Sequence, residues 1–155
     1  MLFRSNRWDD IEPAIRFAVN QGATNVIIDP LTRLVSSDPS EANKQLVEIS
    51  DKISKMAKDL GFFYLILTHL NAPQSGKPHE EGGKVHSNQF TGSRAMMRAC
   101  YYMLGIERDK TKEDEIERNT SQFVLLEDIE FGNRGKFDVC YDRQTGDYLE
   151  QDLQI

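Results

Sequence analysis

The chain has 155 residues, of which 39% are hydrophobic and 28% are charged, and its formal net charge is −6 at pH 7. This length suffices for one domain with a buried core, and the acidic balance excludes a generally basic, histone-like DNA-binding protein but not a local basic loop. Since we find no signal peptide and no apolar run long enough for a membrane span, we expect no membrane contact. Cys100 and Cys140 are too few for a disulfide framework, so we expect reduced, buried thiols and a cytosolic compartment.

The first seventy residues alternate between helical and strand patterns. A helix capped by Asp9 or Asp10 is followed by a longer amphipathic helix, predicted from Ser40 to Leu60. Asn25–Asp29 and Phe62–Thr68 are apolar runs without polar alternation, which is typical of strands buried on both faces of a parallel sheet. The alternation of helices and strands therefore predicts an α/β fold.

The second part of the chain is predicted to be a loop followed by short strands. Residues 71–88 are rich in Pro, Gly, Lys, His and Glu without periodicity, which indicates a functional or mobile loop. A charged segment at 110–119 is expected to be solvated and flexible. The other predicted elements are a short helix at Ser93–Arg98, strands at Tyr101–Ile106, Phe123–Leu126 and Phe137–Tyr141, a turn at Arg143–Gly146 and a last short strand. Without a repeat or a linker, we expect residues 1–155 to form a single domain.

Two polar residues follow the two predicted strands of the first part. Asp29 ends one strand and His69 ends the next, so both are expected at the carboxyl edge of the sheet, where open α/β sheets bind ligands. There Asp29 could hold a magnesium ion beside nucleotide phosphates, and a neutral His69 could contact a γ-phosphate or its attacking water. The alternatives are that Asp29 caps the turn before Pro30 and that His69 bonds a backbone carbonyl. The pairing of the two residues favours a ligand site.

The loop at residues 71–88 is a candidate DNA-binding segment. Lys77 and Lys84 supply positive charge, and the glycines of the loop permit close approach to a phosphate backbone. Glu80 and Glu81 partly cancel this charge, so a plain mobile surface loop is the alternative. The histidines of the loop have no metal-ligand spacing with a cysteine, which excludes a zinc site.

Six strings of the sequence together resemble a known family. They are Val26–Leu31, Leu67–Leu70, Gly76–Gly82, Thr91–Arg98, Gly105–Arg108 and Tyr141–Gly146. In this order they resemble the DnaB-like replicative DNA helicases, especially the helicase domains of phage primase-helicases and of mitochondrial Twinkle. The resemblance implies a RecA-like fold of the P-loop NTPase type. Such a fold has a mainly parallel sheet flanked by helices and a C-terminal antiparallel hairpin, here without the P-loop strand and helix.

For nucleotide chemistry, the resemblance implies an ATP-driven motor. Val26–Leu31 would be the Walker B strand, with Asp29 as the magnesium-associated carboxylate. His69 would be the γ-phosphate sensor. Arg108 matches an arginine near the nucleotide pocket, and Tyr141 matches an aromatic residue near the nucleotide base.

For DNA, the resemblance implies threading of single-stranded DNA through a ring of six subunits. Lys77 and Lys84 would line the central channel, and Arg98 falls where family members place a residue that touches DNA phosphate. Such a protein would work in the cytoplasm of a bacterial or phage-infected cell, or in a mitochondrion.

Two departures from the family pattern limit this interpretation. The 155 residues contain no G-x-x-x-x-G-K-[ST] string and lack the catalytic carboxylate that follows it in the family. Asp128 and Glu130 occupy the positions of a lysine and of the arginine finger, which contributes roughly a thousandfold or more to turnover. Either Arg134 or Lys136 substitutes for that finger, or this chain cannot complete a neighbour's active site.

Three hypotheses follow. The chain is part of a working helicase that needs ATP and magnesium once the phosphate-binding half is supplied, or it is a catalytically inactive helicase-like protein that binds a helicase ring or its DNA. A RecA-like recombinase or a circadian-type ATPase is the third, which the Gly-His-Glu-Glu type of loop disfavours. In every case we expect the 155 residues alone to have negligible ATPase activity.

Overall fold

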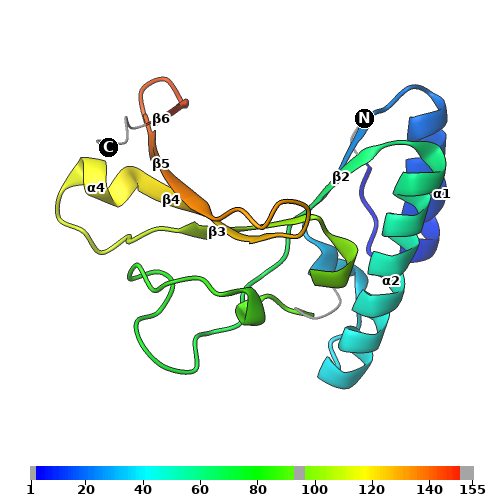
Figure 1. Cartoon of the computed structure of the whole chain (residues 1–155), viewed down its shortest axis with the longest axis horizontal. Coiled ribbons are helices and arrows are strands. Elements are labelled where there is room, and N and C mark those ends of the chain that lie inside the picture. The colour runs from blue at the N-terminus through cyan, green and yellow to red at the C-terminus, as the bar shows by residue number, and fades with distance from the viewer. Residues whose placement is uncertain (1–2, 93–96, 151–155) are drawn as a thin grey trace. The chain divides into compact units, whose positions relative to one another are not determined.

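The structure is a computed structural model that describes residues 3–92 and 97–150 (Figure 1). The chain divides into two compact units. Unit 1 comprises Met1–Leu70 and Phe90–Cys100, and unit 2 comprises Asn71–Gln89 and Tyr101–Ile155. Unit 1 contains the parallel strands, and unit 2 contains the antiparallel strands together with the candidate DNA-binding loop.

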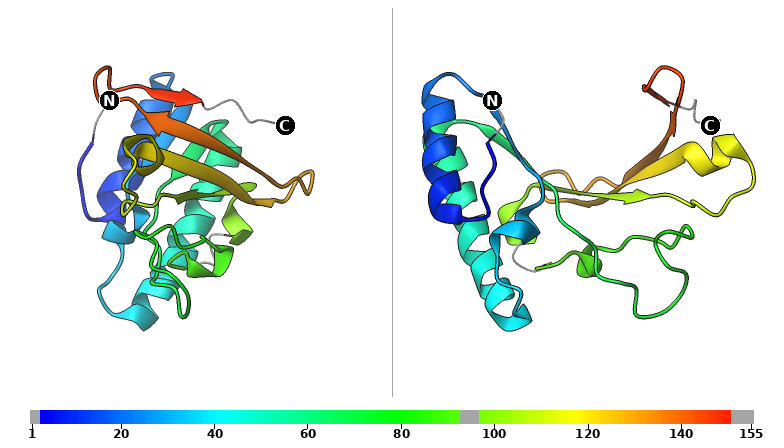
Figure 2. Two further views of the ribbon diagram at one scale, coloured as in Figure 1. Left: turned by 90° about the vertical axis from the view of Figure 1, so that its left-hand side faces the viewer. Right: turned by 180° about the vertical axis from the view of Figure 1, so that it is seen from behind.

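Unit 1 is built on a parallel pair of strands. Its elements are α1 (Trp8–Asn20), β1 (Asn25–Ile28), the 3-10 helix η1 (Leu31–Leu34), α2 (Pro39–Leu60) and β2 (Phe63–Ile66). Strand β1 pairs in parallel with β2, with Asn25 opposite Phe63 and Ile28 opposite Ile66. Figures 1 and 2 show α1 and α2 together on one side of the strand pair. The predicted order of helix, strand, helix and strand is confirmed.

The long helix α2 follows the sequence prediction. The carboxylate of Asp38 accepts the N–H groups of Ser40 at 3.0 Å and Glu41 at 3.1 Å, which satisfies two of the free amides at the helix start. Gly61 ends the helix in the left-handed conformation, with φ 71°. The apolar stripe of the helix is buried: Leu46, Ile49, Ile53, Met56 and Ala57. This stripe supplies much of the core of unit 1.

Helix α1 differs from the prediction at its start. It begins at Trp8, and the capping position is Arg7, whose side chain makes no capping hydrogen bond. Asp9 and Asp10 lie in the first turn instead, where carboxylates interact favourably with the helix dipole. The prediction that Asp9 or Asp10 caps the helix is therefore wrong.

The two parallel strands are covered on one face only. Ile28 is buried, whereas Ile27 is 65% exposed on the other face of the pair, beside Phe63 at 60% and Leu65 at 44%. The prediction of burial on both faces is wrong, because an apolar strand does not itself determine how many layers cover it. In the described residues of unit 1, the second face of this pair is an open apolar surface.

Unit 2 is an antiparallel sheet with a loop held against it. The strands, in sheet order, are β3 (Tyr102–Glu107), β4 (Thr120–Asp128), β5 (Gly135–Tyr141) and β6 (Tyr148–Glu150). Strand β3 alternates between exposed and buried residues, so one face of the sheet is covered. The loop contains the short 3-10 helix η2 (Ser87–Gln89). The expected antiparallel hairpin is thus the centre of a four-stranded sheet.

Other sequence expectations have mixed outcomes. The charged segment at 110–119 contains the short helix α4 (Glu115–Asn119), capped by Asp114, so it is ordered rather than structureless. Of the helix expected at Ser93–Arg98, residues 93–96 lie outside the described residues, and residues 97–99 are helical. Both cysteines are free as expected, but they are half-buried rather than buried. Within the described ranges, no helix is long and apolar enough to cross a membrane.

Candidate functional site

The carboxyl edge of the parallel pair in unit 1 carries the two residues expected there. Asp29 follows the last residue of β1, and His69 follows β2 by three residues. Because the two strands are parallel and paired in register, both residues leave the same edge of the sheet. Both side chains are exposed. The two residues therefore lie at one carboxyl edge of the sheet, as expected for a ligand site.

A network of hydrogen bonds connects the segments that follow the two strands. The N–H of Leu31 donates to the carbonyl of Leu67 at 2.9 Å, and the fully buried Leu31 side chain fixes the start of η1. On the same side, the hydroxyl of Thr32 is 2.8 Å from Nδ1 of His69. The Asp29–Pro30 peptide bond is cis. Thr32 thus holds the imidazole ring through Nδ1, which leaves Nε2 for a ligand.

The environment of Asp29 suits a hydrated cation. In the described residues, its carboxylate has no hydrogen bond or ion pair with another side chain. A cavity of about 820 Å³ adjoins it in unit 1, and its lining includes Asp29, Arg4 and Arg33. Guanidinium groups beside a free carboxylate suit an anionic ligand that carries a divalent cation. The hydroxyl of Thr68, next to His69, is buried without a hydrogen-bond partner in the described residues. Thr68 and His69 are not part of the lining of this cavity, and the described residues contain no group of three or more His, Cys, Asp or Glu that could hold a metal ion. Asp29 alone would therefore contact a magnesium ion through its waters, and the chain contains no glycine-rich phosphate cradle.

The loop of residues 71–89 in unit 2 is more ordered than its composition predicts. Gly83 donates its N–H to the carbonyl of Pro78 at 2.9 Å, and Lys110 donates its N–H to the carbonyl of Glu80 at 3.0 Å. Of the two lysines, Lys77 is exposed, whereas Nζ of Lys84 lies 2.8 Å from a carboxylate oxygen of Glu107. The loop is therefore folded around its turn and connected to β3.

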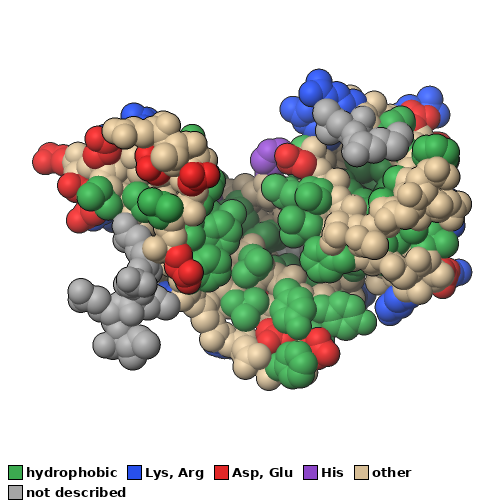
Figure 3. All heavy atoms as spheres, turned by 90° about the horizontal axis from the view of Figure 1, so that it is seen from above, with side chains coloured by type: hydrophobic (Ala, Val, Ile, Leu, Met, Phe, Trp, Pro, Cys, Tyr) green, Lys and Arg blue, Asp and Glu red, His purple; other side chains and the backbone are tan. Residues whose placement is uncertain are grey.

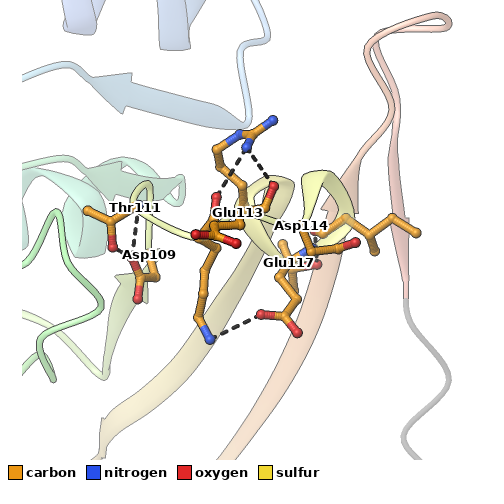
Figure 4. Close-up of polar contacts among 9 residues, drawn as sticks. Asp109, Thr111, Glu113, Asp114 and Glu117 are labelled. Atoms are coloured by element: carbon orange, nitrogen blue, oxygen red, sulfur yellow. Dashed lines mark hydrogen bonds and ion pairs between the residues drawn. The ribbon is translucent and has the colours of Figure 1, made fainter.

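Arg108 serves the structure of unit 2. Its Nε donates to the carbonyl of Arg118 at 2.7 Å, and its Nη2 donates to Oδ1 of the buried Asn119 at 3.0 Å. Arg108 also lines a groove of about 510 Å³ that continues along α4. Figure 4 shows the polar contacts at this end, where Asp114 accepts the N–H of Glu117. The nucleotide contact expected of Arg108 stays a prediction, and in this structure its guanidinium makes two hydrogen bonds with the α4 segment.

The α4 end of unit 2 is strongly acidic. Figure 3 shows acidic side chains gathered at this end. They include the exposed Glu113, Asp114, Glu115 and Glu117. Nζ of Lys112 pairs with Glu117 at 3.0 Å, which offsets only part of this charge. A nucleic-acid phosphate is disfavoured here by repulsion.

The two acidic residues at the expected finger positions have structural contacts. Asp128 is buried at the end of β4 and accepts the N–H groups of Glu130, Phe131 and Asn133 at 3.1, 2.9 and 3.2 Å. These bonds, that from Phe131 above all, hold the pKa of Asp128 below its usual value. Glu130 accepts a hydrogen bond from the hydroxyl of Tyr102, and this contact raises the pKa of Tyr102. Asp128 thus shapes the β4–β5 turn, and Arg134 at that turn is exposed.

The predicted site residues fall into two groups. Asp29, His69 and the exposed Arg98 belong to unit 1. The others belong to unit 2: Lys77, Lys84, Arg108, Asp128, Glu130 and Tyr141, whose ring lies 5.1 Å from that of Tyr148. Sequence reasoning missed Thr32 and Glu107. No local pattern reveals these two, since their partners lie 37 and more than 20 residues away in the sequence.

Comparisons with known proteins agree with this architecture. No protein-family model matches the chain. Over 90 residues, 57% of the chain, the sequence is 29% identical to the DNA helicase/primase of Enterobacteria phage T3. Among solved structures, one ATPase domain has a TM-score of 0.72 at 18% identity, covering 94% of this chain. A DnaB-like replicative helicase, from a structure concerned with its interactions with primase, has a TM-score of 0.71 at 16% identity, covering 92%.

The chain therefore has a RecA-like fold, the fold of the solved helicase structures to which it is similar. More narrowly, these comparisons bear out the resemblance: the chain is similar to part of the motor domain of DnaB-like replicative helicases. It spans 52% of the solved ATPase domain, 34% of the second helicase chain and 16% of the phage protein.

Proposed function

We propose that the chain is part of an ATP-dependent replicative DNA helicase, which unwinds duplex DNA by moving along single-stranded DNA. The observation that carries this proposal is the common edge of β1 and β2, from which Asp29 and His69 both emerge. The similarity to a phage helicase/primase supports it. The ring of six subunits belongs to this proposal as well.

In this motor, each residue of the edge has one task. A bound nucleotide with magnesium supplies the phosphoanhydride whose hydrolysis drives movement. Asp29 would hold the magnesium ion through its waters, and His69 would donate or accept a hydrogen bond at Nε2. Thr32 holds the ring through Nδ1 at 2.8 Å. Arg108 and Tyr141 are proposed only for the nucleotide base and its surroundings. The phosphate cradle must come from residues other than these 155, since they contain no P-loop string.

For DNA contact, we propose the exposed Lys77 of the loop and the exposed Arg98 of unit 1. The loop folds around Gly83, so its backbone is presented in a defined shape. Lys84 was also expected to contact DNA, and its ammonium group lies 2.8 Å from a carboxylate oxygen of Glu107.

The proposal is tested by supplying the missing half. ATPase activity and binding of single-stranded DNA are measured for the 155 residues, for a chain bearing a Walker A segment of a related helicase, and for their mixture. We expect negligible turnover from the chain alone and turnover that appears on mixing. Loss of this turnover in Asp29→Asn is required, and turnover by the chain alone would refute the division of labour.

A second candidate is a catalytically inactive protein that binds a helicase ring or its DNA and modulates replication. It is favoured by the contacts of Asp128 and Glu130, because both acids take part in the fold of unit 2 where the family carries cations. This candidate requires that adding the chain to an intact helicase lowers unwinding. Recovery of activity on mixing with a Walker A half would instead support the first function.

A further inference from the structure

Glu107 of β3 is a buried carboxylate that binds the candidate DNA loop at two points. It is only 7% exposed. Its Oε1 accepts the N–H of Val85 at 2.8 Å, and its Oε2 lies 2.8 Å from Nζ of Lys84. A carboxylate removed from water is stable only where such partners replace the lost hydration. The contacts with Val85 and Lys84 together stabilise the buried carboxylate, and they fix the loop at these two adjacent residues.

Packing beside Glu107 reinforces this connection. Val85 is 3% exposed, and a side chain added at Gly105 would come within 2.9 Å of its Cγ1. Val85 thus lies against the strand where β3 has no side chain. A bridge between Glu81 and Asp109 joins the loop to the residues after β3. The loop is attached along its second half, from residue 80 to residue 85.

The first half of the loop contains the other lysine. Lys77 is exposed, and it precedes the turn at which Gly83 donates to Pro78. Lys84 is also 67% exposed, but its ammonium group lies against a carboxylate. A lysine that neutralises a DNA phosphate releases counterions condensed on the DNA. A lysine whose charge is already balanced by a carboxylate contributes less to this release than a lysine without an ion pair. The two lysines therefore differ in what they can contribute to the salt dependence of DNA binding.

We propose that Glu107 is a positioning residue, which holds the loop at Val85 and neutralises the charge of Lys84. Lys77 then provides the contact of the loop with DNA phosphate. This inference rests on the proposed DNA contact of the loop. It reduces the expected DNA-binding set of the loop from two lysines to one. The proposal also gives the string Gly105–Arg108 a role, because Glu107 holds the candidate DNA loop and Arg108 holds α4.

The test uses the full chain and a fluorescent 20-nucleotide oligo-dT, with affinity measured against salt. In Glu107→Gln the amide oxygen still accepts from Val85, but Lys84 is released. We expect the logarithm of the affinity to fall more steeply with the logarithm of the salt concentration. The magnitude of this salt slope should increase by about 0.7, the value for one phosphate contact on a single strand. Adding Lys84→Met to Glu107→Gln should restore the original slope. Glu81→Gln is the matched control, since it also removes one negative charge, here from the loop itself, without releasing Lys84.

The opposite assignment gives a different pattern. If Lys84 already contacts phosphate, Glu107→Gln leaves the slope unchanged and the double variant falls about 0.7 below the original. That result overturns the proposal. Lys77→Ala should lower the slope of the original chain by the same amount, and an unchanged slope would remove Lys77 from the DNA contact.

Hydrogen exchange separates failure of this inference from failure of the proposed function. In Glu107→Ala we expect faster exchange at the Val85 amide, with the β4–β5 amides unchanged as an internal reference for folding. Unaltered exchange at the Val85 amide would show that Glu107 does not hold the loop. If no variant binds oligo-dT, the DNA function of the loop fails, while the exchange result still decides whether Glu107 holds the loop.

Discussion

Replacement of Gly83 by alanine should disorder the candidate DNA loop. Gly83 is buried inside the turn, and its N–H donates to the carbonyl of Pro78. A Cβ at this position would lie 2.1 Å from the carbonyl oxygen of Lys77 and 2.7 Å from that of Pro78. These are backbone atoms, so no side-chain rotation can relieve the overlap. The loop must open for the methyl group to fit.

The size of the effect follows from this overlap. A contact at 2.1 Å is roughly 1 Å or more below van der Waals separation. Overpacking of this kind costs about 1–3 kcal/mol, which is about 5- to 150-fold in the equilibrium between the closed and open loop. The remainder of unit 2 keeps its strand pairing, because the overlap involves only loop residues. We therefore expect a local opening rather than unfolding.

Hydrogen exchange and DNA binding measure this opening. In Gly83→Ala, the amides of residues 80–85 should exchange about 5- to 150-fold faster, and binding of oligo-dT should weaken while circular dichroism stays unchanged. Gly135→Ala is the matched control, because an added Cβ there meets no atom within 4 Å among the described residues. Normal protection of the loop amides in Gly83→Ala would show that the turn does not have this geometry and would refute the reasoning.

Three further results are expected. Thr32→Val should release the imidazole ring of His69, so nitrogen NMR should show a mixture of its two tautomers. Thr32→Ser keeps the hydroxyl and should show a single tautomer. Identical spectra for the two variants would count against the contact between Thr32 and His69. Asp29→Asn should abolish turnover of the reconstituted motor but change the free energy of unfolding by less than about 0.5 kcal/mol, because the side chain is exposed. The lowered pKa of Asp128 stabilises the folded chain above the unfolded pKa of about 3.9 and loses this effect as pH falls through the folded value. Urea unfolding of Asp128→Asn should therefore depend less on pH below about 4, and an unchanged dependence would contradict this.

Parts of the fold were predictable because they depend on local chemistry. The apolar stripe of α2 and its end at Gly61 depend on residues within a few turns of one helix. The cap at Asp38 is equally local, although it was not predicted. The common edge of Asp29 and His69 follows from the parallel pairing of two apolar runs. Neither inference needed a long-range contact beyond that pairing.

The incorrect and missing predictions depend on what surrounds a segment. The exposed Ile27 and Phe63 are as apolar as any buried strand residue, so their sequence cannot reveal an uncovered face. The role of Glu107 cannot be predicted from its neighbours in the sequence, because its partners Val85 and Lys84 lie 22 and 23 residues away. Asp128 could have been interpreted locally, because an acid before a turn containing glycine and asparagine commonly accepts backbone amides.

The backbone of His69 takes part in the hydrogen bonds at the base of the candidate DNA loop. Two residues after His69 the loop begins, and its base is closed by backbone contacts: Asn71 donates to Gln89 at 2.7 Å, and Leu70 forms a bridge with Phe90. The carbonyl of His69 itself accepts from the N–H of Thr91 at 3.3 Å and from its hydroxyl at 3.2 Å. We therefore expect that any shift of the His69 backbone on ligand binding at Nε2 also displaces Thr91, because both of these hydrogen bonds end on the His69 carbonyl.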